Sequence, residues 1–176
     1  RRILTSLILL LLLGLAYLYS YALIIVLIIT SMISWIEIKS LLSKILNKKK
    51  FFETIFKLLS LIYLLFFSVL IFKNMSDANT KLFTIYLFFV CINSDIGGLV
   101  FGKIFKGKKL TKISPKKTIS GSLGSFFLSL FFVPVFHYIF EYSYHFIFLV
   151  FTTIAVSFFC QLGDLFISYL KRKAKV

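Results

Sequence analysis

The chain has 176 residues, of which 60% are hydrophobic, 23 are phenylalanine and only 15% are charged, and its mean hydropathy is +0.98. A water-soluble domain of this length has too small an interior to bury so many apolar side chains, so the soluble and disordered classes are excluded. The net charge of +15 would suit nucleic acid, but the basic residues lie between apolar segments, where they fix the orientation of membrane helices. We therefore expect an all-α, polytopic membrane helix bundle that binds no nucleic acid.

Apolar runs predict about six transmembrane helices. The first run, 3–38, would extend roughly 54 Å as one helix, well beyond a hydrocarbon core of about 30 Å. We expect it to divide into two short spans, with Tyr17, Tyr19 and Tyr21 at the interface between them. The expected spans are 3–18, 22–38, 51–72, 82–101, 119–140 and 146–170.

Basic residues are distributed unequally between the two sides of this topology. One side receives Arg1 and Arg2, five lysines in a loop at 39–50, seven lysines at 102–118 and four basic residues at 171–175. The other side receives Lys73 and Lys81, in a short polar loop at 73–81. The positive-inside rule places the first side in the cytoplasm.

Two carboxylates lie within apolar runs, Asp95 and Asp164. Placing a carboxylate there costs about 2.5–3.5 kcal/mol on insertion scales, so each is expected to face a polar cavity and to pair with a cation. A structural polar contact between helices is the alternative. Cys91 and Cys160 also lie in apolar runs, without metal-ligand spacing, and are expected to be small buried residues.

The residues after Asp164 share its face of the helix. Ser168, Lys171 and Arg172 follow at four, seven and eight positions, within an arc of roughly 80–100°. A carboxylate suits a hard cation and Lys and Arg neutralise phosphate, so this face suits a metal-bound polyphosphate. An ordinary basic flank of a membrane helix would also carry the two cations.

A second group of polar residues begins the span at 119–140. Ser114, Pro115, Lys116, Lys117 and Thr118 place hydroxyls, lysines and a proline at a helix N-terminus, where exposed N–H groups favour an anion. A basic flank with a capping serine is again the alternative. The pattern indicates a phosphate-holding turn.

Taken in order, these motifs resemble the bacterial phosphatidate cytidylyltransferases, or CDP-diacylglycerol synthases. Residues 93–125, NSDIGGLVFGKIFKGKKLTKISPKKTISGSLGS, resemble that family's Asp-containing helix, its FGK segment and its S-P-x-K-T turn. Residues 163–172, GDLFISYLKR, resemble the opening of its signature, S-x-[apolar]-K-R. The K-D, H-G-G and D-R-x-D elements that complete the signature do not occur before Val176, and the first residue is Arg1, so we expect a fragment that is inactive alone.

The resemblance implies a nucleotidyltransferase of phospholipid biosynthesis that converts CTP and phosphatidate to CDP-diacylglycerol and diphosphate. It implies Mg²⁺, leaves a second cation open, and places a multi-pass protein in the bacterial inner membrane with its site facing the cytoplasm. Residues 1–92 would be N-terminal membrane helices, with three or four spans, and 93–176 a truncated catalytic region. A homodimer stays open. The implied catalytic residues are Asp164, also the metal ligand, Asp95, Lys171 and Arg172, and the implied substrate-binding residues are Ser114, Lys116, Lys117, Thr118 and Ser168.

Two other functions compete with this one. A CTP-dependent polyprenol or phytol kinase would share a cytosolic polyphosphate site, but the S-P-x-K-T and S-x-[apolar]-K-R motifs favour the cytidylyltransferase. A small non-enzymatic transporter would use Asp95 and Asp164 as ion sites. The seven lysines at 102–118 argue against a transporter.

Overall fold

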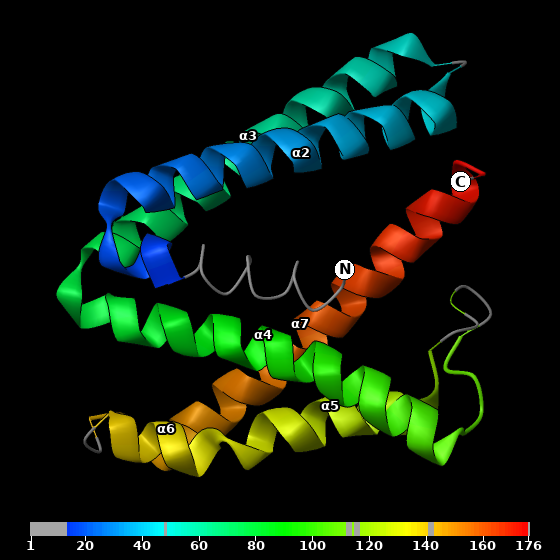
Figure 1. The fold of residues 1–176 in the computed structure, drawn as a ribbon. Helices are drawn as coiled ribbons and strands as arrows, with labels where there is room; N and C mark the ends of the chain where they lie inside the picture. The colour runs from blue at the N-terminus through cyan, green and yellow to red at the C-terminus, as the bar shows by residue number, and fades with distance from the viewer. Residues whose placement is uncertain (1–13, 48, 112–113, 115–116, 141–142, 176) are drawn as a thin grey trace. The chain divides into compact units, whose positions relative to one another are not determined.

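The computed structural model describes residues 14–47, 49–111, 114, 117–140 and 143–175. The helices are α2 (Ser20–Leu46), α3 (Lys50–Ser76), α4 (Ala78–Phe105), α5 (Ile119–Phe131), α6 (Val133–Ile139) and α7 (Phe146–Lys173), and Figure 1 shows their order. Within the described residues, five segments are long and apolar enough to cross a membrane: α2, α3, α4, Ile119–Ile139 and α7. The predicted all-α, multi-pass membrane bundle is thus confirmed. The first predicted span, 3–18, lies mostly outside the described residues.

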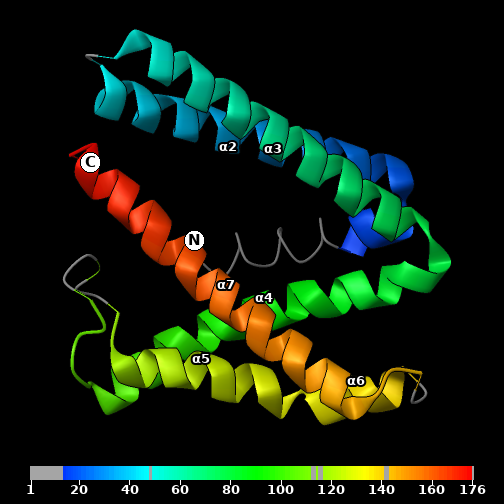
Figure 2. The same cartoon turned by 180° about the vertical axis from the view of Figure 1, so that it is seen from behind.

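The chain divides into two compact units, Arg1–Thr84 and Ile85–Val176, with the boundary inside α4. In the first unit, α2 and α3 form an antiparallel hairpin, which Figure 2 shows from behind. Ser31 and Ser68 join these two helices by a hydrogen bond of 2.7 Å between their hydroxyls. Hydroxyl pairs of this kind hold membrane helices together, because apolar side chains gain little from leaving lipid.

The second unit contains the part of α4 from residue 85 onward with α5, α6 and α7. Figures 1 and 2 both show α4 and α5 antiparallel and side by side. Glycine permits this close approach: a Cβ at Gly97 would lie 2.4 Å from the carbonyl oxygen of Gly124, and a Cβ at Gly121 would lie 2.7 Å from that of Gly98. No other residue type fits at these crossings without displacing a helix.

One end of the second unit is closed by an aromatic core. Tyr86 is buried against the rings of Phe136 and Phe140, with centroids 4.9 and 5.7 Å away. Its hydroxyl donates to the carbonyl oxygen of Leu149 at 3.1 Å and also bonds the hydroxyl of Thr153. These hydrogen bonds of the Tyr86 hydroxyl hold α4 against the first turns of α7.

The predicted loops are wrong in their extent, because the helices continue beyond the apolar runs. Lys39 and Lys44, expected in a loop, lie on α2, and only Asp77 separates α3 from α4. In the same way α4 extends to Phe105, into the segment expected as a loop at 102–118. Lysine is a good helix former whose long side chain reaches the interface, so a basic residue does not end a membrane helix.

The span predicted at 119–140 is present as Ile119–Ile139, although it is divided into two helices, and one further expectation needs correction. The span 119–140 is interrupted at Phe132, because Pro134 lacks an N–H and its ring crowds the carbonyl of the preceding turn. Cys91 and Cys160, expected to be buried, are half-buried free thiols whose Sγ atoms lie 3.1 Å apart. They are neighbours on α4 and α7.

Candidate functional site

The segment between α4 and α5 returns on itself as a short hairpin. The N–H of Leu110 donates to the carbonyl oxygen of Lys117 at 2.8 Å, and the N–H of Ile119 donates to that of Lys108 at 3.0 Å. An isolated antiparallel bridge between Lys109 and Thr118 lies between these two bonds. The hairpin therefore fixes the backbone of Lys117 and Thr118 just before α5 begins.

Thr118 is the N-cap of α5. Its backbone is extended, and its hydroxyl accepts from the N–H of Gly121 at 3.1 Å. Capping of this kind satisfies one of the N–H groups that a helix start leaves unpaired. The N–H of Lys117 in turn donates to the carbonyl oxygen of Ser114 at 3.1 Å, which turns Ser114 back toward the same helix start.

A cavity of about 370 Å³ lies beside this helix start, between α4, α5, α7 and the hairpin. Its size is within the range of small-molecule sites. Apart from glycines and the apolar Leu99 and Leu110, its lining side chains are polar. The lining residues are Ser94, Asp95, Gly98, Leu99, Leu110, Ser114, Lys117, Thr118, Gly121, Ser122, Ser125, Gln161 and Asp164.

Charged groups from three parts of the chain meet in this cavity. Lys117 Nζ donates to Asp164 Oδ2 at 2.8 Å, and Asp95 lines the same space from α4. The side chains of Lys117 and Asp164 are 29% and 57% exposed, so neither is locked away from a ligand. The expected polar cavity for both carboxylates is present, and Asp164 has a cation partner.

The comparison with known proteins identifies a family for this chain. A family model described as "Cytidylyltransferase family" matches residues 1–176. The chain belongs to the cytidylyltransferase family. Among curated relatives named phosphatidate cytidylyltransferase, that of Rickettsia conorii is 40% identical over 116 residues, which cover 62% of this chain and 50% of the relative.

Two other relatives carry the same name. The protein of Bacillus subtilis is 35% identical over 49% of this chain and 34% of its own length, and that of Staphylococcus haemolyticus is 32% identical over 72% and 48%. This member of the cytidylyltransferase family therefore spans about half the length of the curated relatives it matches or less. No solved structure gave a significant match.

The structure brings together five of the residues proposed from the sequence and leaves three apart. Asp95, Ser114, Lys117, Thr118 and Asp164 line the cavity. The other three lie further along α7 and do not line it: Ser168, Lys171 and Arg172.

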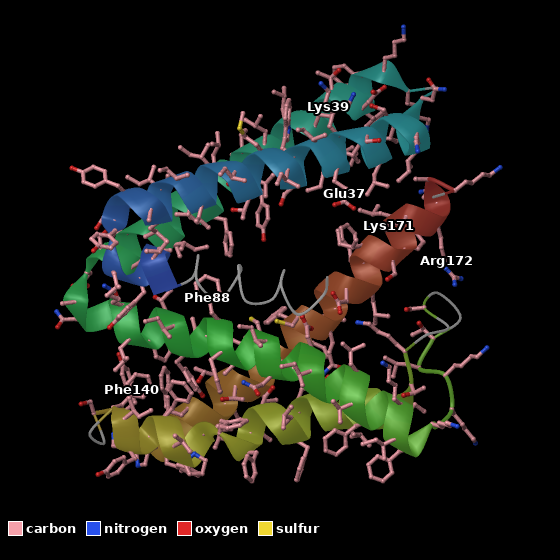
Figure 3. All side chains as sticks on the ribbon, in the orientation of Figure 1. Glu37, Lys39, Phe88, Phe140, Lys171 and Arg172 are labelled. Carbon is pink, nitrogen blue, oxygen red and sulfur yellow. The ribbon has the colours of Figure 1, made fainter. Side chains whose placement is uncertain are left out.

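The distance along α7 explains this separation. Figure 3 shows Lys171 and Arg172 at the C-terminal end of α7, far from Phe140 beside its start. At 1.5 Å per residue they lie about 10–12 Å beyond Asp164 along the helix axis, although they share its face. The remaining proposed residue, Lys116, lies outside the described residues.

Sequence reasoning missed several hydroxyls and one amide at this site. Ser94, Ser122, Ser125 and Gln161 all line the cavity. Gln161 had a signal in the sequence, because an amide within an apolar membrane helix usually faces the interior of a bundle. The serines had none, since a serine is tolerated on any face of a membrane helix.

The lining residues fit a hard divalent cation. Two carboxylates, with hydroxyls beside them, are the oxygen donors that Mg²⁺ accepts. Among the described residues, no three His, Cys, Asp or Glu side chains gather in one place, so phosphate oxygens and water would complete the coordination. The two carboxylates also outnumber the one described lysine of the cavity, and a phosphate ligand would need an added cation to offset them.

Proposed function

We propose that the protein containing this chain transfers the cytidylyl group of CTP to phosphatidate, forming CDP-diacylglycerol and diphosphate. The observation that carries the proposal is the cavity itself, where a capped helix start and Lys117 face the carboxylates of Asp95 and Asp164 between membrane helices. Family membership and the names of the relatives support the same reaction. The site is proposed to face the cytoplasm from the bacterial inner membrane, as the positions of the basic residues indicate.

The start of α5 supplies the phosphate-binding part of the site. N–H groups at a helix N-terminus point at an anion, and the helix dipole favours negative charge there. Lys117 lies at the same place and adds a full positive charge. Ser114 and Thr118 contribute hydroxyls that line the cavity and can donate to phosphate oxygens.

The proposed reaction is an in-line displacement at phosphorus. A phosphate oxygen of phosphatidate attacks the α-phosphorus of CTP, a new P–O bond forms, and the bond to the β-phosphate oxygen breaks to release diphosphate. No covalent enzyme nucleophile is needed, so the chain's residues act by positioning and by charge stabilisation. Mg²⁺ held by Asp164, with Asp95 nearby, would supply Lewis acidity at the phosphoryl oxygens.

The lipid substrate is proposed to reach the cavity from the membrane. Leu99, one of the lining residues, is 64% exposed on α4, a candidate membrane span. An exposed apolar side chain at the edge of a polar cavity allows acyl chains to stay in lipid while the phosphate head enters. The arrangement therefore suits a substrate with one water-soluble and one membrane-bound partner.

The test is the substitution Asp164→Asn in the full-length protein, which keeps size and hydrogen bonding but removes the charge that holds a hard cation. We expect CDP-diacylglycerol formation to fall on the order of a thousandfold or more, since the metal stabilises the transition state by several kcal/mol. The assay is run across a Mg²⁺ series after unfolding in detergent has been compared with the unchanged protein.

Asp77→Asn is the matched control. Asp77 lies between α3 and α4, outside the cavity, and accepts from the N–H of Asn79, a contact that asparagine can also make. Near-normal turnover of Asp164→Asn at ordinary Mg²⁺ would refute the metal role. A variant that fails to accumulate would assign Asp164 to the fold.

A further inference from the structure

A chain of polar side chains crosses the second unit next to the cavity. Ser122 Oγ on α5 donates to Gln161 Oε1 on α7. Gln161 Nε2 donates to the carbonyl oxygen of Ser122 and to Ser157 Oγ, each at 3.5 Å. Ser157 Oγ is 2.9 Å from Ser94 Oγ on α4, so one continuous set of hydrogen bonds joins α5, α7 and α4.

Each end of this chain adjoins a functional group of the cavity. Ser94 precedes Asp95 in the sequence, and Gln161 lies three residues before Asp164, almost one helical turn away. The N–H of Ser122 donates to the carbonyl oxygen of the N-cap Thr118 at 3.1 Å. The polar chain thus links the two carboxylate-bearing helices with the helix start that would hold phosphate.

Burial makes the contact between Ser94 and Ser157 more restrictive than a surface contact, whereas Ser122 and Gln161 are half-buried. Ser94 and Ser157 are 1% and 0% exposed, and a buried hydroxyl deprived of its partner is costly, so these contacts strongly favour one register of α4 against α7. The ion pair between Lys117 and Asp164 is far more exposed, and such pairs hold geometry weakly. Something other than the ion pair must therefore orient Asp164.

We propose that Gln161 is a positioning residue that sets the rotation of α7 against α5, so that Asp164 faces Lys117 and the start of α5. This inference rests on the proposed cytidylyl transfer. Gln161 acts through Asp164 and need not touch the reacting atoms. Its amide suits this task, because one planar group contacts both the hydroxyl and the backbone carbonyl of Ser122 and so resists rotation of the helix.

The experiment compares Gln161→Met with the unchanged full-length protein. Methionine keeps the length of the side chain but makes neither hydrogen bond to Ser122. We expect kcat to fall about tenfold to a hundredfold, because small displacements of a reacting group cost rates of this order. The Mg²⁺ concentration for half-maximal rate should rise, whereas the KM for phosphatidate should stay unchanged.

Two further comparisons separate positioning from stability. Ser122→Ala should lower kcat as Gln161→Met does, whereas Ser122→Thr should keep the kcat of the unchanged protein. The double variant that combines Gln161→Met with Ser122→Ala should have a kcat no lower than that of the less active single variant. Tyr86→Phe removes the hydrogen bonds between α4 and α7 at the aromatic core, far from the cavity. It should lower the unfolding temperature and leave kcat unchanged.

Distinct results would overturn the inference. Gln161→Met with normal kcat, or with losses that add fully to those of Ser122→Ala, would reduce Gln161 to a packing residue. Should Gln161→Met fail to accumulate, equal kcat in Ser122→Ala and Ser122→Thr would overturn the inference. Absence of product from the unchanged protein would overturn the proposed function as well, whereas a fully active Gln161→Met would overturn the positioning role alone.

Discussion

Replacing Lys117 by methionine separates its effect on the fold from its proposed effect on phosphate. Lys117 Nζ is 2.8 Å from Asp164 Oδ2, with side chains 29% and 57% exposed. Exposed pairs of this kind contribute about 0.2–1 kcal/mol to the free energy of unfolding. The unfolding temperature in detergent should therefore change by only a few degrees.

The expected effect on activity is larger. A hydrogen bond to a charged group contributes about 1.5–3 kcal/mol, and at about 1.4 kcal/mol per factor of ten its loss from the transition state lowers the rate roughly 10–150-fold. We expect this loss in kcat/KM for CTP, because Lys117 is placed at the helix start that would hold the triphosphate. The measurement is CDP-diacylglycerol formation at varied CTP and saturating phosphatidate.

Lys109→Met is the matched control for this prediction. Lys109 lies in the same hairpin, bridged to Thr118, but it is exposed and does not line the cavity. Both substitutions remove one positive charge from the same surface. If Lys109→Met lost as much activity as Lys117→Met, general electrostatic attraction of CTP would account for the effect. Unchanged kinetics in Lys117→Met would mean that the turn at 114–118 is only a basic flank of a membrane helix.

Two more predictions concern packing and orientation. Gly124→Ala should destabilise the fold by about 1–3 kcal/mol, because its Cβ would lie 2.2 Å from the Cβ of Phe101. The control is Gly163→Ala, whose Cβ would meet nothing within 4 Å and which should unfold at the normal temperature. Equal unfolding temperatures for the two variants would contradict the packing. Lys108→Cys, with both native cysteines changed to serine, should react with an impermeant thiol reagent from the cytoplasmic side of oriented vesicles. Labelling from the other side alone would contradict the charge-based topology.

The sequence was sufficient for the five membrane spans within the described residues, because their signal is hydropathy summed over about 20 residues. It was less informative about helix ends. Lys39 and Lys44 continue α2, since nothing in a lysine side chain opposes helical backbone and water satisfies its charge beyond the bilayer. The break at Phe132 did have a local signal in Pro134, which was outweighed by the unbroken apolar run.

Two residues of the candidate site could be predicted because their charged side chains lie within apolar runs. Asp95 and Asp164 stood out because a carboxylate in an apolar run requires a polar environment, and both line the cavity. Lys171 and Arg172 share the face of Asp164 but do not line the cavity, because helical periodicity reports the face of a residue and not its height along the axis. Gln161 and Ser122 were missed because their contact joins α5 and α7 across 39 positions of sequence.

The exposure of the pair between Lys117 and Asp164 bears on how the site could accept its ligands. Under the proposed function, a cation held by Asp164 would repel the Lys117 ammonium and weaken its hold on Asp164, which would free Lys117 to turn toward phosphate. In a buried pair this exchange would strand a charge at a cost of several kcal/mol. Here the two side chains are 29% and 57% exposed, so water screens each charge during the exchange. A weak mutual attraction would therefore suit the proposed function, because it could be replaced at little cost if a cation and a triphosphate bound together.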